Sequence, residues 1–167
     1  SLSRNAKRIL PLVACLGHEF DSTIIELVVS RLEDIRQAEF GSISSKLDLI
    51  DIEEALRDCV EKRVLESHTV TKTNQDGQMV TIAYYTFAHD QVQQAALLLQ
   101  ENNELITTQF LIGKTLVESL DDSSHNKFLF VAVDLLNRAI GHTLLCGDKA
   151  SVFDHAHLNL LAGRKSK

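Results

Sequence analysis

The chain has 167 residues, of which 44% are hydrophobic and 24% charged, with a net charge of −6 and a pI near 5.6. This length suits one domain or two small ones, and the acidic balance disfavours a phosphate-backbone partner unless the basic residues gather on one face. Cys15, Cys59 and Cys146 lie far apart without metal-ligand spacing, and no apolar run is long enough to span a bilayer, so we expect a cytoplasmic protein with reduced thiols and no membrane partner.

The first 50 residues predict two helices followed by a loop. Ser3 is the expected cap of the first helix and Gly17 its expected end, although Pro11 lies inside the pattern and must kink the helix or delay its start. Asp21 is expected to cap the second helix. Residues 33–50 lose the apolar periodicity and therefore predict a connecting loop.

The middle of the chain predicts a third helix and a β-hairpin. Asp51 and Glu54 form a capping box ahead of a one-sided apolar stripe. The segments VLESHTVTKT and MVTIAYYTF are rich in β-branched and aromatic residues, and between them Asp76 and Gly77 suit a tight hairpin turn. Three helices followed by a two-stranded hairpin is the order of a winged helix-turn-helix.

The residues after the hairpin predict helices again. Asp90 and Gln93 form another capping box, a helix is expected over about residues 103–120, and the segment NKFLFVAVDLLNRAIG predicts the next one. Asp148 is expected to cap a last helix. Helices joined by short polar turns suggest a helical-repeat array, in which small residues such as Gly113 let neighbouring helices approach closely.

His89 and Asp90 are the candidate site residues, because they lie between the hairpin and the following helix. Asp90 at a helix N-cap would accept a backbone N–H, which explains this residue without any chemistry. His89, one residue earlier, would lie at the N-terminal end of the helix, where unpaired N–H groups and partial positive charge bind phosphate. Both interpretations, a structural cap and a ligand site, stay open at this point.

The other combinations of polar residues indicate no chemistry. His155 and His157 are two residues apart and point to different helix faces, so they cannot chelate a metal together. The sequence contains neither a Gly-x-Ser-x-Gly elbow nor a Gly-x-x-x-x-Gly-Lys-Ser/Thr nucleotide loop. The third helix, DIEEALRDCVEKR, has a net negative surface, unlike a helix that enters the major groove. We therefore expect no enzyme, no metal site and no nucleic-acid partner.

Four segments taken in order resemble one family: LSRNAKRILPLVACLGHEFD, YTFAHDQVQQAA, FVAVDLLNRA and LNLLAGRKSK. They are similar to the region that follows the AAA-like P-loop ATPase core of the STAND type in large signalling proteins, many of them hybrid histidine kinases of fungi and bacteria. The resemblance implies a mainly α fold, with a winged helix-turn-helix and a two-stranded β-hairpin over residues 1–102. Tetratricopeptide-like antiparallel helices would follow over residues 103–167 as the start of a longer array.

The resemblance also implies a function. In related STAND ATPases a His-Asp pair at the hairpin end faces bound ADP, and FAHD lies at the same element, with Phe87 and Ala88 in place of the usual preceding residues. This implies that His89 senses the nucleotide state and that Asp90 is its helix-capping partner.

The implied role is a non-catalytic regulatory module of a two-component signalling protein, excised from a larger chain. ATP or ADP would be bound by the ATPase core, and the module itself would hold no cofactor. Its expected partners are that core, the downstream helical repeats and other proteins. The alternative is a helical protein–protein interaction scaffold without nucleotide sensing, and a transcriptional winged helix is a third option.

Overall fold

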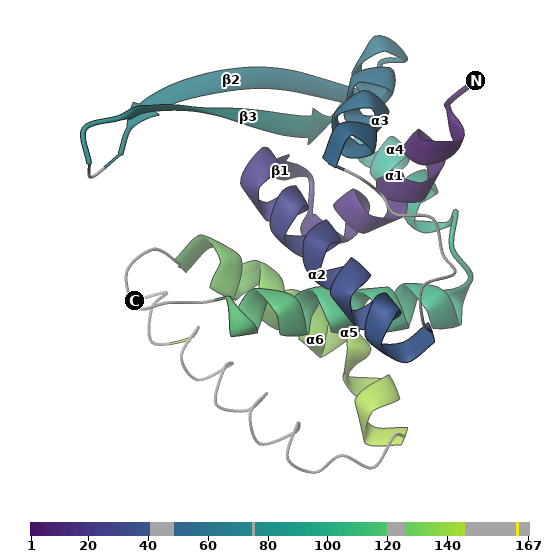
Figure 1. The fold of residues 1–167 in the computed structure, drawn as a ribbon. Helices are drawn as coiled ribbons and strands as arrows, with labels where there is room; N and C mark the ends of the chain where they lie inside the picture. Colours follow the sequence, from purple (N-terminus) through teal and green to yellow (C-terminus); the bar gives the residue numbers. More distant parts are fainter. Residues whose placement is uncertain (41–48, 75, 120–125, 146–162, 164–167) are drawn as a thin grey trace. The chain divides into compact units, whose positions relative to one another are not determined.

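The computed structural model describes residues 1–40, 49–74, 76–119, 126–145 and 163 (Figure 1). The chain divides into two compact units, Ser1–Gln100 and Glu101–Lys167. Within the described residues the first unit contains helices α1 to α4 and a small sheet, and the second contains α5 and α6.

Helix α1 spans Arg4–Leu16 and has the two ends that its sequence predicts. The Ser3 hydroxyl oxygen accepts a hydrogen bond from the Ala6 N–H at 3.1 Å, and Gly17 ends the helix with a φ of 119°. The helix runs through Pro11, which is buried. The predicted cap and end are therefore confirmed.

Strand β1 (Glu19–Asp21) leads directly into helix α2 (Ser22–Phe40). The Asp21 carboxylate accepts the Ile24 N–H at 3.1 Å, so the predicted cap of the second helix is confirmed. The loop predicted over residues 33–50 is wrong where the chain is described, because α2 continues to Phe40. Residues 41–48 lie outside the described part. The segment EDIRQAEF lacks an apolar stripe but is rich in good helix formers, and this propensity prevails.

Helix α3 spans Leu49–Glu61, so it begins before the predicted capping box. Asp51 is already inside the helix, and the predicted Asp51–Glu54 box is therefore wrong. At the other end Arg63 adopts a φ of 58°, and the Val64 N–H donates to the Cys59 carbonyl at 2.9 Å. This reversal brings the chain out of α3 and into the sheet.

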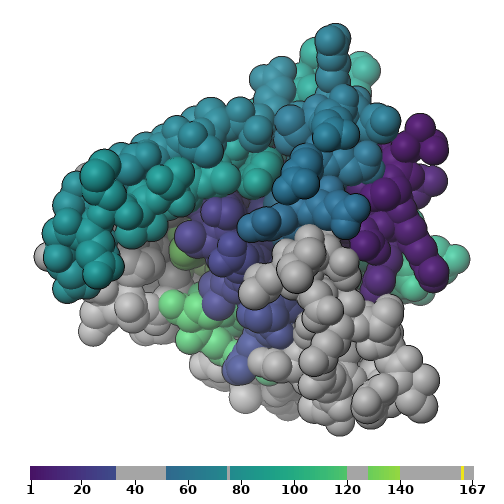
Figure 2. All heavy atoms as spheres, turned by 45° about the horizontal axis from the view of Figure 1, so that its top comes forward, coloured from purple at the N-terminus to yellow at the C-terminus, as the bar shows by residue number. Residues whose placement is uncertain are grey.

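The sheet has three antiparallel strands in the order β1-β3-β2. β2 (Leu65–Thr73) and β3 (Met79–Phe87) form the predicted hairpin, in which the Asn74 side chain accepts the N–H groups of Asp76 and Gln78. β1 pairs with the other edge of β3 over Tyr84–Thr86. The hairpin tip lies away from α3 in Figures 1 and 2, and Met79 beside the turn is 76% exposed.

The fold class predicted from the sequence is wrong. The described residues combine six helices with a three-stranded antiparallel sheet, which is a mixed α/β arrangement. The prediction was a mainly α chain with a winged helix-turn-helix, a two-stranded hairpin and tetratricopeptide-like helices. The third strand was missed because Glu19–Asp21 is too short for any alternation of apolar and polar residues to be visible.

The core of the first unit forms where α1, α2 and α3 meet the sheet. Phe20 of β1 is 1% exposed and contacts Phe87 of β3 edge-on, with ring centroids 5.9 Å apart. The same unit also contains fully buried aliphatic side chains, namely Ile9, Val13, Ile25, Val28 and Leu65. The buried end of β3 therefore fixes the start of the segment that follows it.

The second unit is described over α5 (Asn102–Glu118) and α6 (Asn126–Leu145). The two helices pack closely at Gly113, where a Cβ atom would lie 2.8 Å from the Leu136 Cγ. Leu116 and Leu135 are fully buried in this contact region. The helix predicted after Asp148 lies outside the described residues.

Candidate functional site

The candidate site lies at the start of helix α4 (Asp90–Leu97), directly after β3. His89 is the N-cap residue, with extended backbone angles of φ −152° and ψ 148°. Its carbonyl accepts the N–H groups of Val92 at 2.9 Å and Gln93 at 3.3 Å. Its imidazole makes no capping hydrogen bond, and the residue is exposed. The backbone of His89 is thus engaged while its side chain is available to solvent.

The residues before His89 anchor it from two directions. The Phe87 N–H donates to the His18 carbonyl at 3.0 Å, and the Ala88 N–H donates to the Val64 carbonyl at 3.1 Å. The Phe87 ring itself is buried. These contacts tie the entry to α4 to the residues just before β1 and just before β2, next to the buried core.

Asp90 does not have the position that the sequence predicts. It is the first residue of α4 and His89 takes the N-cap position, so the prediction of Asp90 as the capping residue is wrong. The Gln93 side chain does not complete a capping box either, because its Nε2 donates to the Ala14 carbonyl at 2.9 Å. Ala14 lies in the last turn of α1, where carbonyls lack partners within the helix. Gln93 therefore ties α4 to α1.

The structure adds His18 to the site. Its Nδ1 lies 3.3 Å from the Asp90 Oδ1, with the two side chains 49% and 84% exposed. Such an exposed contact contributes at most about 1 kcal/mol to stability, and it is ionic only when the imidazole is protonated. Sequence analysis missed His18 because the residue precedes β1, far from Asp90 in the chain, and no short motif joins the two.

The geometry at the start of α4 suits an anion. The first N–H groups of α4, at Asp90 and Gln91, point out of the helix end and carry partial positive charge. Two imidazoles, those of His18 and His89, come from the neighbouring segments, whereas the Asp90 carboxylate opposes an anion unless His18 neutralises it. Among the described residues no group of three His, Cys, Asp or Glu side chains is arranged to hold a metal ion.

The remaining candidates from the sequence lie elsewhere. Cys15 and Cys59 are buried and unbridged, and burial together with the neighbouring Asp58 charge raises the pKa of the Cys59 thiol to about 12. Cys146, His155 and His157 lie outside the described residues. Among the helices of the described ranges, none is both long and apolar enough for a membrane crossing.

Comparisons with protein-family models, curated proteins and solved structures gave no match. The functional interpretation of the site therefore depends on the chemistry of its own residues.

Proposed function

We propose that the chain is a non-catalytic regulatory module of a cytoplasmic signalling protein with a STAND-type P-loop ATPase core, of the histidine kinase class. In this proposal His89 contacts a phosphate of ADP bound by that core. The observation that supports it best is the imidazole of His89, exposed and without a capping bond at the N-terminal end of α4. A helix N-terminus of this kind attracts phosphate, and the His89 side chain can bind one without first breaking a capping hydrogen bond.

The coupling mechanism follows from differential affinity. A nucleotide shifts the equilibrium between two conformations only by the difference in its binding free energy between them. A hydrogen bond from His89 to a charged phosphate contributes about 1.5–3 kcal/mol, which corresponds to roughly tenfold to hundredfold in the equilibrium constant. If the contact forms in the ADP state alone, it stabilises that state by this amount.

The role proposed for His18 and Asp90 is electrostatic. A protonated His18 imidazole neutralises the Asp90 carboxylate 3.3 Å away and so reduces its repulsion of a phosphate at the helix end.

The test compares two histidine substitutions in the full-length protein. His89→Ala removes the proposed contact, and His68→Ala removes an exposed histidine of β2 as the matched control. The release rate of a fluorescent ADP analogue is measured by stopped flow, together with the kinase output. We expect release to be about ten times faster or more in His89→Ala and unchanged in His68→Ala.

Equal ADP release in the His89→Ala variant and the wild-type protein would contradict the proposal. That result, with unchanged output, is what the alternative of a protein-binding scaffold without nucleotide sensing predicts. DNA retardation at low salt by the isolated chain would instead indicate the transcriptional option.

A further inference from the structure

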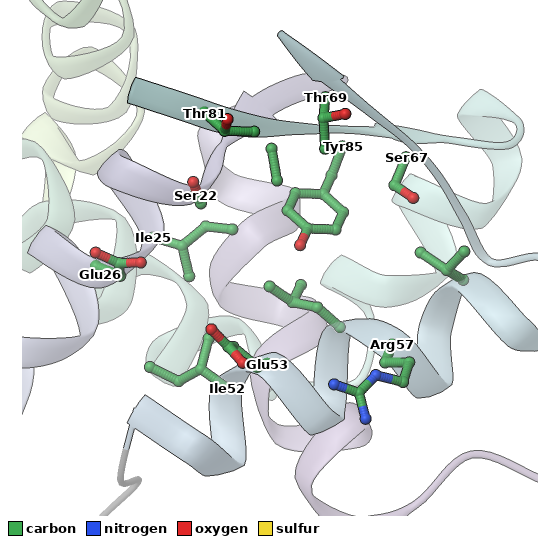
Figure 3. A pocket seen from close by; sticks show the side chains of 13 residues that line it. Ser22, Ile25, Glu26, Ile52, Glu53, Arg57, Ser67, Thr69, Thr81 and Tyr85 are labelled. Carbon is green, nitrogen blue, oxygen red and sulfur yellow. The ribbon is translucent and has the colours of Figure 1, made fainter. Parts of the chain in front are cut away.

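A cleft of about 560 Å³ opens between α2, α3 and the β2–β3 hairpin (Figure 3), and His89 is not among its lining residues. Its floor is apolar, because Ile25, Ile52 and Leu56 line it and are each at most 3% exposed. The Tyr85 ring projects into it from β3 and stacks on Phe20, with ring centroids 5.9 Å apart. The cleft therefore offers an apolar base beneath an aromatic ring that packing holds in place.

The hairpin contributes hydroxyl groups to the cleft and keeps its cation outside. Alternate strand residues share a face, so Ser67 and Thr69 of β2 line the cleft together with Thr81 of β3. Lys72 belongs to the opposite face, where its Nζ lies 5.7 Å from the centroid of the Tyr84 ring. The one lysine of the hairpin strands is therefore not available to neutralise the cleft.

Charged groups at the mouth of the cleft make it net acidic. Among the described residues that line it, the charged ones are Glu26 of α2 and Glu53 and Arg57 of α3. In the view of Figure 3 the two carboxylates lie to the left of the Tyr85 ring and the Arg57 guanidinium lies to its right. Neither carboxylate forms an ion pair with another described residue. Burial raises the pKa of Tyr85; Glu53 and Glu26 raise it further and Arg57 lowers it. At the Tyr85 hydroxyl the charge of Glu53 therefore acts more strongly than that of Arg57.

We infer that this cleft is a docking site for a basic segment of a partner protein, with one arginine or lysine side chain seated in it. The methylene groups of that side chain would lie on Ile25 and Leu56, which suits a long amphipathic side chain. Its cation would lie beside the Tyr85 ring and between Glu26 and Glu53.

The size and charge of the cleft favour this occupant over the other classes. The volume exceeds that of a single side chain, so the flanking peptide backbone also fits and its groups can bond to the hairpin hydroxyls. An acidic peptide or a nucleic acid would meet two carboxylates against one guanidinium among the described lining residues. The net charge of −6 of the whole chain also favours association with a basic partner.

The test uses the 167-residue chain and defined peptides in an NMR titration. The probe is acetyl-Gly-Arg-Gly-amide, and its citrulline analogue has nearly the same shape without the charge. We expect saturable shifts of the Ile25, Leu56 and Tyr85 signals with the arginine peptide and at least tenfold weaker binding of the citrulline peptide. Higher salt should weaken binding of the arginine peptide, because the peptide cation and the carboxylates of the cleft are all partly exposed to solvent.

Matched carboxylate variants locate the binding site. Glu26→Gln with Glu53→Gln removes the proposed partners, whereas Glu54→Gln with Glu66→Gln removes two exposed carboxylates that do not line the cleft. The first pair of substitutions is expected to weaken binding of the arginine peptide at least tenfold, and the second pair to leave its affinity unchanged. Equal effects of both pairs, equal binding of citrulline, tighter binding of acetyl-Gly-Glu-Gly-amide, or no shift at the cleft would each overturn the inference.

Discussion

Gly113→Ala tests the packing of α5 against α6 through the sign of its effect. The added Cβ would lie 2.8 Å from the Leu136 Cγ, 3.0 Å from its Cδ2 and 3.2 Å from the Ala132 carbonyl oxygen. All three separations are shorter than ordinary contact, and Leu136 is only 7% exposed, so it has little room to move. Overpacking of this kind costs about 1–3 kcal/mol, while alanine gains about 1 kcal/mol over glycine in a helix. We therefore expect Gly113→Ala to lower the free energy of unfolding of the α5–α6 pair by roughly 0–2 kcal/mol.

The assay is amide hydrogen exchange of the α5 backbone, which reports the local stability of this helix pair. The control is the same substitution in a Leu136→Ala background, where the two closest contacts are absent. There Gly113→Ala is expected to stabilise α5 by up to about 1 kcal/mol, because the helix propensity gain remains. A difference of less than about 0.5 kcal/mol between the two backgrounds would refute the reasoning, since it would show that Gly113 and Leu136 are not coupled.

Three further predictions concern the first unit. Cys59, whose pKa is raised to about 12 by burial, is expected to resist iodoacetamide at pH 8 in the folded chain and to react after unfolding, which mass spectrometry of the labelled peptide measures. The Ser3 N–H donates to the Asp58 carboxylate at 2.7 Å and holds the pKa of that carboxyl below its ordinary 3.8. The ionised Asp58 therefore stabilises the fold above pH 3.8, and this stabilisation is lost as the pH falls through the lowered pKa. Acid titrations should show a smaller loss of stability in Asp58→Asn than in the wild type. Gln93→Ala removes the hydrogen bond to the Ala14 carbonyl, and urea unfolding should show a free energy of unfolding lower by about 1 kcal/mol. An unchanged free energy of unfolding would mean that water fully replaces the amide at this carbonyl.

Local chemistry explains which parts of the fold were predictable. The cap at Ser3, the cap at Asp21 and the turn at Gly77 each depend on a few adjacent residues, and all three are present as expected. Strand β1 depends instead on β3, since Phe20 pairs with Tyr85 far along the chain. A three-residue strand has no pattern of its own, so its partner determines it. The predicted fold class was wrong because it lacked this third strand.

The same distinction applies to the candidate site. His89 was identifiable because a hairpin end and a helix start are both local signals, and its position at the N-cap lies one residue from the predicted cap. His18 and the cleft of Glu26 and Glu53 could not be found in this way, because tertiary packing brings together their segments from separate parts of the chain. At Gln93 a local pattern was misleading: the sequence predicts a capping box with Asp90, but the Gln93 side chain bonds to the Ala14 carbonyl of α1 instead.

The central proposal is that His89 contacts nucleotide phosphate in one state only, and a structure of the full-length protein with ADP bound tests it most directly. The deciding quantity is the distance from the nearer imidazole nitrogen of His89 to the closest phosphate oxygen. The proposal predicts a separation of about 2.7–3.2 Å with ADP and loss of this contact with ATP. A separation beyond about 4 Å with ADP, too long for a direct hydrogen bond, or the same contact in both nucleotide states, would contradict it.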